Sequence, residues 1–344
     1  MEDGWCLTES DPQVFSELLR QLGVKGLQVD DLYSLDAETL APLQPIYALI
    51  FLFKYVGGGA EDRAGVQVDA LDSGVWFANQ TPGRDELRTH ETPLASLAAR
   101  RSPAIADTQV INNSCGTIAA LNAVMNVDAP GVEIGSELGN LKEFGAGMGS
   151  MDLGHVVASS DQIREVHNSF SKTSPFSLDP SAVPDEAKED AYHFITYLPV
   201  HGLLYELDGL QASPIMHAPV DEGENWLDAA RETIQARIET YPPGSVMFNL
   251  LAVRADPVPR LRAELAQPDL SEGRKYEIQE QLQHEESKRA RGAMENSLRR
   301  HNILPVVLEL FKAFAESEDA EGRERTIDAA REKGRKRREA NKDE

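Results

Sequence analysis

The sequence predicts an α/β (α+β) fold followed by an all-helical C-terminal extension. Three observations support this prediction: helical apolar spacing near the start, several apolar runs of strand length, and a change to charged, helix-favouring residues after residue 255. We therefore expect a mixed first domain over residues 1–255 and a helical second domain over residues 256–344, without internal repeats.

The first expected element is a helix within the segment ESDPQVFSELLRQLGVKG. Asp11 can cap this helix, Pro12 suits its first position, and Gly23 ends it. Its apolar residues recur at helical spacing and form one face: Val14, Phe15, Leu18, Leu19 and Leu22.

Core strands are expected at four apolar runs, and a further helix is expected from about 115 to 126. The first run, IYALIFLFKYV at 46–56, is interrupted by Lys54 and is too short to span a membrane. The runs YHFITYLP and GLLYELDG flank a short turn, and VMFNLLAV at 246–253 is the last core strand.

Three segments lack such periodicity and are expected to be loops or a hinge. Residues 79–108 and 168–190 combine charges with prolines, and long segments of this kind are usually functional or disordered. Residues 254–273 contain three prolines and are interpreted as a hinge between the two domains.

The composition describes a soluble, acidic protein of a reducing compartment. The net charge is −23, from 57 acidic and 34 basic residues, which disfavours general nucleic-acid binding. Two cysteines cannot form a disulfide framework, and the acidic N-terminus is unlike a signal peptide, so we expect a cytoplasmic and nuclear location. A basic run at 331–338 is either a solvated tail or a nuclear-import or anionic-surface patch.

Cys115 lies where the polar segment QVINNS becomes the apolar helix. Unpaired N–H groups and the helix dipole at a first helical turn favour a thiolate, and Ser114 can cap the helix. A buried cysteine without chemical function is the alternative.

A thiolate that cleaves an amide needs a base, a group that orients the base, and an oxyanion site. With a turn centred on Val200 and His201, His193 lies directly opposite Asp208 on one sheet face, with Cβ atoms about 5 Å apart. His201 in the turn and His217 in a following loop are weaker candidates. A half-buried structural histidine and a simple turn aspartate are the alternative interpretations.

Gln109 lies six residues before the cysteine, so its side-chain amide and the Cys115 N–H can form an oxyanion hole. Neither an H-E-x-x-H motif nor paired cysteines occur, so no metal or cofactor is expected.

The segments QVINNSCGT and YHFITYLPVHGLLYELDGL together resemble the signature of ubiquitin C-terminal hydrolases, papain-like cysteine peptidases that release ubiquitin from its conjugates. The resemblance extends to WCLTESDPQVFSELLRQLGVKG, PIYALIFLFKYV, IREVHNSF and FNLLAV. It implies a papain-like antiparallel sheet flanked by helices. It also implies that residues 168–190 are the crossover loop, which restricts leaving-group size, and that the acidic surface suits ubiquitin's basic tail.

The same resemblance assigns a role to each candidate residue. Cys115 matches the nucleophile, His193 the general base and acid, and Asp208 the carboxylate that orients the histidine. Gln109 matches the oxyanion donor.

The C-terminal segment RRHNILPVVLELFKAFAE resembles the helical extension of long, proteasome-associated members of this family. The resemblance implies docking to a helical activating domain of a proteasomal ubiquitin receptor. The expected anchor residues follow i, i+3, i+4, i+7 spacing, as in a helix that binds a groove; they are Val307, Leu310, Phe311 and Phe314. Packing of this helix back onto the catalytic domain is the alternative.

One departure from the family pattern is an insert of roughly thirty residues, at about 80–108. The family runs from an FA-x-Q strand directly into VINN, whereas here WFANQ ends at Gln80 and QVINN resumes at Gln109. The insert is either a lineage-specific loop or intronic sequence translated into the chain. Because Gln109 keeps the spacing to Cys115, the oxyanion role is assigned to it and not to Gln80.

Two other functions remain open at this point. A chromatin-associated deubiquitinase of the same family is supported by the basic run at 331–338. A catalytically blocked ubiquitin-binding scaffold, with the insert covering the cleft, is the third interpretation.

Overall fold

The structure is a computed structural model that describes residues 5–6, 9–54, 64–80, 113–170, 192–221, 223–241, 248–301 and 304–317, with seven further positions between 322 and 335. Nearly all of the predicted loop at 168–190, nearly all of the insert and half of the basic run therefore lie outside the described residues. Contacts divide the chain into two compact units, of which the first ends at Arg300 and the second begins at His301.

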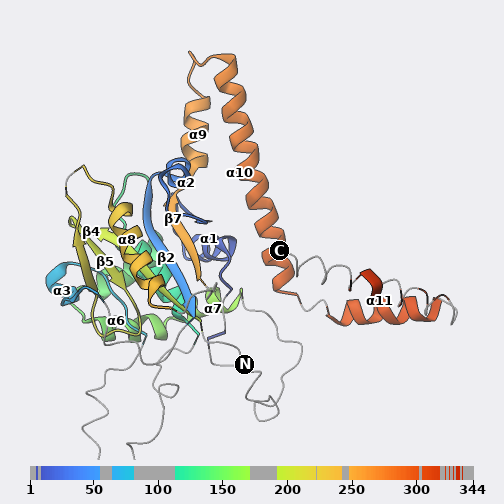
Figure 1. Ribbon diagram of the computed structural model, residues 1–344, viewed down its shortest axis with the longest axis horizontal. Helices are drawn as coiled ribbons and strands as arrows, with labels where there is room; N and C mark the ends of the chain where they lie inside the picture. Colours follow the sequence, from blue (N-terminus) through green and yellow to red (C-terminus); the bar gives the residue numbers. More distant parts are fainter. Residues whose placement is uncertain are drawn as a thin grey trace, which may run out of the picture. The chain divides into compact units, whose positions relative to one another are not determined.

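The first unit is a mixed α/β fold, as predicted, and Figure 1 labels its elements. In chain order they are α1 (Pro12–Gln21), β1 (Leu27–Asp31), α2 (Ala37–Leu40), η1 (Ala41–Leu43), β2 (Ile46–Lys54), β3 (Val66–Gln67), α3 (Ala70–Ser73), α4 (Cys115–Val124), α5 (Gly135–Phe144), α6 (Ser150–Ser159), α7 (Asp161–Asn168), β4 (Tyr192–Val200), β5 (Leu203–Leu207), β6 (Ile215–Pro219), α8 (Trp226–Glu239), β7 (Phe248–Ala255), α9 (Pro257–Leu265) and α10 (Glu272–Arg299).

One antiparallel sheet forms the centre of this unit, with the order β1-β7-β2-β4-β5-β6-β3. Side chains alternate between its faces, and each face has its own apolar core. The α1 and α4 helices pack on one face, where Phe194 and Leu198 of β4 are buried. Figure 1 shows α8 on the other face, where Ile195 and Tyr197 of the same strand share an apolar core with residues of that helix.

Four predicted elements are confirmed by the structure. The α1 helix begins at Pro12, with the Asp11 carboxylate accepting a hydrogen bond from the Gln13 N–H at 2.7 Å. Its chain turns away at Gly23, which has a φ of 95°, in the left-handed region that glycine tolerates. The expected strands at 46–56 and 246–253 are β2 and β7, and the helix expected at 115–126 is α4.

The predicted hinge at 254–273 is wrong, because residues 257–265 form α9 and the segment ends in the first turn of α10. Asp256 caps α9 through a hydrogen bond from the Val258 N–H, and Pro257 occupies the first position of the helix. Prolines are tolerated in a first helical turn, where the missing N–H has no helical partner. Pro257 and Pro259 therefore lie in the first turn of a helix, and only Pro268 lies in the turn between α9 and α10.

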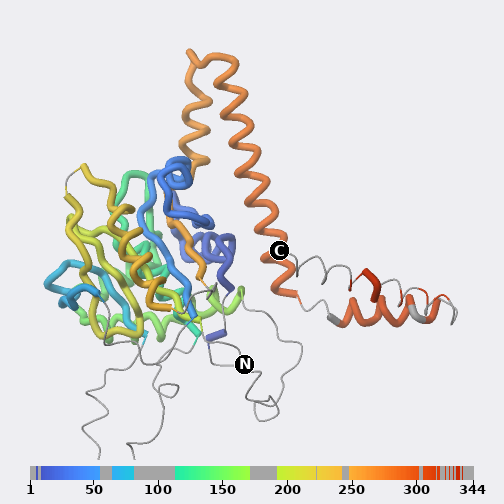
Figure 2. The backbone as a smooth tube through the Cα atoms, in the orientation of Figure 1, coloured from blue at the N-terminus to red at the C-terminus, as the bar shows by residue number. Residues whose placement is uncertain are grey.

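The division between the two compact units falls near residue 300 and not at the predicted boundary near 255. The α10 helix, beside α9 in Figure 2, packs on α1. Asn296 Nδ2 donates to the Gln13 carbonyl at 3.1 Å, and Arg299 forms ion pairs with Glu9 and Asp11. A Cβ atom on Gly292 would lie 2.8 Å from Gln13 Cβ, so only glycine permits this close approach.

A buried charge network also holds α10 to the sheet. Lys288 of α10 lies 2.9 Å from Asp30 of β1, and Arg254 of β7 pairs with both Asp30 and Glu285. Burial alone raises the pKa of Asp30, but the Arg254 and Lys288 charges outweigh it and hold that pKa below its ordinary value. The α10 helix is therefore part of the unit that contains the sheet.

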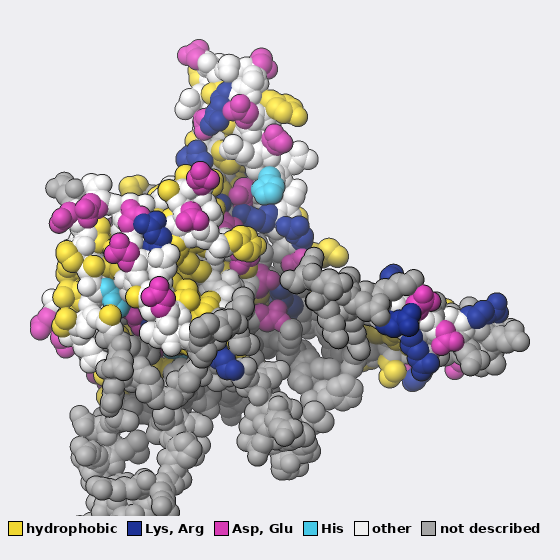
Figure 3. Space-filling view, viewed as in Figure 1, with side chains coloured by type: hydrophobic (Ala, Val, Ile, Leu, Met, Phe, Trp, Pro, Cys, Tyr) yellow, Lys and Arg dark blue, Asp and Glu magenta, His cyan; other side chains and the backbone are white. Residues whose placement is uncertain are grey.

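The second unit contains α11 (Leu304–Ser317), which matches the helix expected at 301–314. The four predicted anchor side chains, Val307, Leu310, Phe311 and Phe314, are all exposed. No helix of the described residues is long and apolar enough to cross a membrane. In the first unit, Asp and Glu side chains are spread over the face visible in Figure 3.

Candidate active site

Cys115 is the first residue of α4, and the chain enters this helix through an unusual backbone conformation. Asn113 has a φ of 64°, in the left-handed region, which asparagine adopts more readily than most residues. Its side-chain amide donates to the Trp5 carbonyl at 3.2 Å. Ser114 does not cap the helix through its side chain, contrary to expectation, because its backbone is not in the extended conformation of an N-cap. Backbone geometry and the Trp5 contact therefore fix the approach to Cys115.

The rest of α4 is a rigid support for the cysteine. Every residue from Gly116 to Val124 is buried, and a truncated large apolar side chain in such a core typically costs about 2–5 kcal/mol. Thr117 Oγ1 lies 2.7 Å from His167 Nδ1 of α7, which ties the first turn to a second helix. Cys115 itself is half-buried, so its thiol is held firmly at the edge of the core.

Close packing brings the start of β4 to the start of α4. A Cβ atom on Gly116 would lie 3.3 Å from the Phe15 ring and 3.6 Å from the Phe194 ring, so the glycine leaves room for both aromatic rings. Farther along, Thr196 Oγ1 donates to the Ala119 carbonyl at 2.7 Å. Because Phe194 follows His193 in β4, this packing places His193 beside Cys115.

The β4–β5 turn differs from the predicted one by a shift in register. Val200 pairs with Leu203, so the turn residues are His201 and Gly202, one position later than assumed. Both have positive φ values, 50° and 74°, as the tight hairpin turn that matches strand twist requires. Paired residue numbers therefore sum to two more than assumed, and Asp208 is not directly opposite His193. An even shift keeps the same face, however, and Asp208 follows directly after β5.

His193 and Asp208 form a buried pair despite this correction. The distance from His193 Nε2 to Asp208 Oδ1 is 2.5 Å, and the two residues are 4% and 1% exposed. The same carboxylate oxygen accepts a hydrogen bond from the Leu210 N–H at 2.9 Å. The backbone hydrogen bond from Leu210 therefore fixes the Asp208 carboxylate, and the carboxylate orients the imidazole of His193.

The Cys115 side chain is hydrogen-bonded to His193, so the three side chains form one connected group. Since Nε2 contacts Asp208, Nδ1 is the ring nitrogen that remains for the sulfur. Burial lowers the pKa of His193, but the Asp208 charge and the hydrogen bonds to Asp208 and Cys115 outweigh it and raise that pKa to about 9. His193 therefore holds a proton at neutral pH beside the sulfur, as a thiolate–imidazolium pair requires.

The predicted oxyanion donor, Gln109, lies outside the described residues. The other glutamine of the duplicated motif, Gln80, is described and is 2% exposed. Its backbone N–H donates to the carbonyl of Gly209, the residue after Asp208, at 2.7 Å. Sequence spacing alone did not single out Gln80, although its place at the end of the WFANQ motif was a signal.

The other two histidine candidates, His201 and His217, are not part of the group formed by Cys115, His193 and Asp208. His201 is in the hairpin turn, and His217 is in β6, not in a loop. His217 Nε2 lies 3.0 Å from Glu206 Oε2, which makes it part of a neighbouring buried cluster. Among the described residues, no group of three or more His, Cys, Asp or Glu side chains could hold a metal ion.

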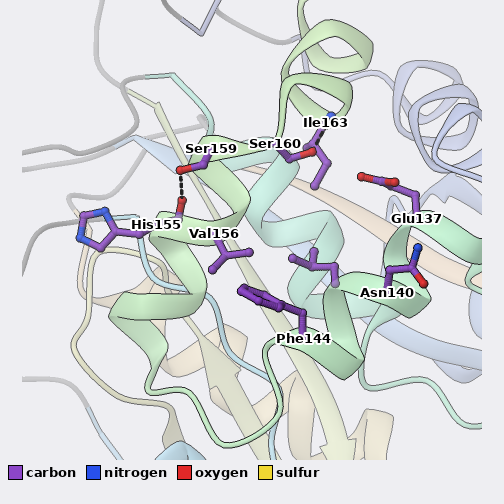
Figure 4. A pocket seen from close by; sticks show the side chains of 9 residues that line it. Glu137, Asn140, Phe144, His155, Val156, Ser159, Ser160 and Ile163 are labelled. Atoms are coloured by element: carbon purple, nitrogen blue, oxygen red, sulfur yellow. Dashed lines mark hydrogen bonds between the residues drawn. The ribbon is translucent and has the colours of Figure 1, made fainter.

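A separate, largely apolar pocket of about 610 Å³ lies between α5, α6 and α7. Figure 4 shows Phe144 and Val156 facing each other across it, with Ser159 bonded to the His155 carbonyl at its rim. The residues that line the pocket include none of the catalytic candidates, so the pocket is not part of the candidate active site.

The comparison with protein families shows the family to which the chain belongs. The family model "Ubiquitin carboxyl-terminal hydrolase, family 1" matches residues 5–84 and 98–239. The chain belongs to the ubiquitin carboxyl-terminal hydrolase family. The gap in the match falls within the predicted insert, and a second model, "Ubiquitin carboxyl-terminal hydrolases", matches residues 276–319 of α10 and α11.

Relatives and solved structures resemble this ubiquitin carboxyl-terminal hydrolase over nearly its whole length. Ubiquitin carboxyl-terminal hydrolase ubh-4 of Caenorhabditis elegans is 36% identical over 318 residues, 90% of this chain and 87% of its own. Ubiquitin carboxyl-terminal hydrolase 2 of Schizosaccharomyces pombe is 34% identical and covers 90% of each chain. The crystal structure of Trichinella spiralis UCH37 bound to ubiquitin vinyl methyl ester is similar with a TM-score of 0.63 and 30% identity, over 84% of this chain and 99% of that one.

Membership of this family establishes the activity class. The protein is a thiol-dependent ubiquitinyl hydrolase, a long ubiquitin carboxyl-terminal hydrolase that carries a C-terminal helical extension. The papain-like mixed α/β architecture expected from the sequence is confirmed by the same structural similarity.

Asp208→Asn should lower the pKa of His193 from about 9 toward or below its ordinary value of 6.5, because burial is then no longer outweighed by the carboxylate charge. An NMR titration of the His193 ring proton measures the change. In the parent, the raised pKa means that the pair stabilises the fold fully below pH 6.5, and that this contribution is lost as the pH rises through about 9.

The exposed Asp221 provides the matched control, since Asp221→Asn makes the same chemical change away from the site. The parent and the control should titrate alike, and Asp208→Asn should lose the alkaline fall in stability. An unchanged His193 titration in Asp208→Asn would show that the carboxylate does not set the imidazole's charge.

Proposed function

We propose that Cys115, His193 and Asp208 are the catalytic triad of this deubiquitinase. The observation that carries the proposal is the buried His193–Asp208 pair with the Cys115 thiol hydrogen-bonded to the imidazole. Cys115 Sγ attacks the carbonyl carbon of ubiquitin's C-terminal glycine, and the carbonyl oxygen becomes an oxyanion. His193 then donates its proton to the leaving amine, and a thioester remains on Cys115.

The second half of the reaction uses the same imidazole as a base. After the amine has left, neutral His193 takes a proton from water, which attacks the thioester and releases ubiquitin with a free C-terminal carboxylate. Asp208 keeps Nε2 bonded throughout, so Nδ1 remains directed at the reacting atoms. The acidic surface supports binding of ubiquitin's basic C-terminal tail.

Cys115→Ala should abolish both hydrolysis of a C-terminal fluorogenic amide of ubiquitin and covalent labelling by ubiquitin vinyl methyl ester. Cys6→Ala is the matched control, because Cys6 is the only other cysteine of the chain and is also half-buried. It should retain both activities. Mass spectrometry of the labelled protein should locate the probe on Cys115.

A parent protein that binds ubiquitin but is neither labelled nor active would instead favour a catalytically blocked scaffold with the insert over the cleft. Labelling that persists in Cys115→Ala would contradict the assignment of the nucleophile.

For the oxyanion, we propose a hole formed by the Cys115 N–H and the side-chain amide of Gln109. The first N–H groups of a helix have no helical partner, so the amide of Cys115 is available. The spacing to Cys115 supports Gln109. The burial of Gln80 and its backbone bond beside Asp208 support Gln80 as a second candidate.

Gln109→Ala should lower kcat by about 10²–10³-fold, the usual cost of removing one oxyanion donor, with little change in KM. Gln80→Ala makes the identical change at the other end of the insert and should have a smaller effect on kcat. Steady-state kinetics on the fluorogenic ubiquitin amide separate the two. The reverse order would transfer the donor role to Gln80.

We also propose that α11 docks the enzyme to a proteasomal ubiquitin receptor, and that the protein acts in the cytoplasm and nucleus. The family match over 276–319 and the exposed Val307, Leu310, Phe311 and Phe314 support this proposal. A deletion that tests it should begin at His301, because α9 and α10 belong to the first compact unit. A cut at 256 would remove buried partners of Asp30 and Arg254.

Phe311→Asp should reduce co-purification with the proteasome at least tenfold, because an anchor side chain buried in a groove often carries 2 kcal/mol or more, about thirtyfold. Lys312→Asp places the same side chain at the next exposed position of the helix and should retain binding. Both variants should hydrolyse the fluorogenic substrate normally. Retained proteasome binding by Phe311→Asp, together with salt-sensitive nucleosome binding through 331–338, would favour the chromatin-associated alternative.

A further inference from the structure

A second buried carboxylate, Glu206, lies two residues before Asp208. It is 2% exposed, and three side chains from three different elements donate to it. Arg237 Nη1 of α8 is 2.6 Å from Oε1, while the Tyr197 hydroxyl and His217 Nε2 are each 3.0 Å from Oε2. Because side chains alternate along a strand, Glu206 and Asp208 extend from the same side of the chain, toward α8.

The guanidinium of Arg237 also lies over the ring of Phe53 in β2. Its Cζ atom is 4.3 Å from the ring centroid, a cation–π distance. The same ring meets the imidazole of His193 edge to face, at 5.7 Å between centroids and an interplanar angle of 88°. Phe53 is therefore a direct physical link between Arg237 and the catalytic imidazole.

Arg237 interacts electrostatically with the triad as well. Burial lowers the pKa of Arg237, but the charges of Glu206 and, more weakly, Asp208 outweigh it and raise that pKa well above its ordinary value. The guanidinium is therefore permanently charged, and it interacts with the carboxylate that holds His193.

From these contacts we propose that Arg237 is a positioning residue for His193, acting through the ring of Phe53 and held in place by Glu206. With Phe53 fixed against it, the imidazole is hindered from rotating about its Cβ–Cγ bond. Nε2 then stays on Asp208 and Nδ1 stays directed at Cys115. The inference rests on the proposed roles of Cys115, His193 and Asp208.

The chemistry of the side chain explains why an arginine occupies this position. A planar guanidinium can lie flat on an aromatic ring while an N–H of its edge donates to a carboxylate. A lysine ammonium can pair with Glu206 but cannot cover the ring of Phe53 with a plane. Arg237→Lys therefore keeps the buried charge balanced and removes mainly the contact that the proposal requires.

The experiment compares Arg237→Lys with Arg231→Lys in the full chain. Arg231 lies on the same helix, where it pairs with Asp228 at 3.2 Å, so its replacement is a matched control. Arg237→Lys should lower kcat for the fluorogenic ubiquitin amide about tenfold with KM unchanged, since small displacements of catalytic groups act on the chemical step. Arg231→Lys should match the parent in both constants.

A double-mutant cycle with Phe53→Leu tests the route of the effect. If Arg237 acts through the ring, Arg237→Lys should cause no further fall in kcat once Phe53 has become leucine. An equal, independent fall in the Phe53→Leu background would overturn the role of the ring. An unchanged kcat in folded Arg237→Lys, or a change confined to KM, would overturn the proposal as a whole.

Thermal unfolding and circular dichroism establish that each variant is folded. If Arg237→Lys does not fold, Glu206→Gln takes its place, since it keeps the size of the buried side chain and weakens the hold on Arg237. It should likewise lower kcat and not KM, and an unchanged kcat there would overturn the proposal. Labelling of the parent at Cys115 by ubiquitin vinyl methyl ester tests the triad separately, so the two failures are distinguishable.

Discussion

The active site depends on the packing of α4 against β4. Cys115 belongs to a helix that packs on one face of the sheet, whereas His193 belongs to a strand of the sheet. They meet because each lies at the start of its element. The hydrogen bond from Thr196 to the Ala119 carbonyl sets how far the helix is displaced along the strand. Gly116 lies at this contact, where a Cβ atom would be tight against the Phe15 ring at 3.3 Å and in van der Waals contact with the Phe194 ring at 3.6 Å.

Electrostatic interactions then determine the charge and orientation of the assembled side chains. Two carboxylates, Glu206 and Asp208, leave the same side of one chain segment and are both removed from water. Each is fully provided with donors, and each holds a cation: Glu206 holds Arg237, and Asp208 holds His193 in its protonated form. Interactions between such groups are stronger in a poorly polarisable interior than at the surface, so the imidazole is held in one orientation.

Residue patterns predicted the elements whose signals are local. The cap at Asp11, the start of α1 at Pro12 and the apolar run of β2 follow from short-range chemistry, and all are present. The sequence also predicts the pairing of β4 with β5, but it does not predict the register of that pairing. The turn was assigned one residue too early, at Val200 and His201. A type I′ turn needs positive φ at both positions, which glycine adopts and a β-branched valine does not, so Gly202 and not Val200 belongs to the turn.

Elements whose signals are not local were missed or misread. Strand β1 is short and mostly polar in sequence, yet Asp30 is buried because Arg254 and Lys288 arrive from β7 and α10. The helices α5 to α8 were not foreseen, because their apolar faces are narrow or interrupted by glycine and serine. The hinge interpretation of 254–273 failed for Pro257 and Pro259, because both lie in the first turn of α9, where proline is tolerated.

The contact between α10 and α1 has a consequence for how the protein is made. Asp11 and Gln13 leave the ribosome roughly 280 residues before Gly292, Asn296 and Arg299, which contact them. At bacterial or eukaryotic elongation rates of about 5–20 residues per second, α1 waits some 15–60 seconds for these partners. The nascent hydrolase therefore exposes this side of α1 until α10 has been synthesised.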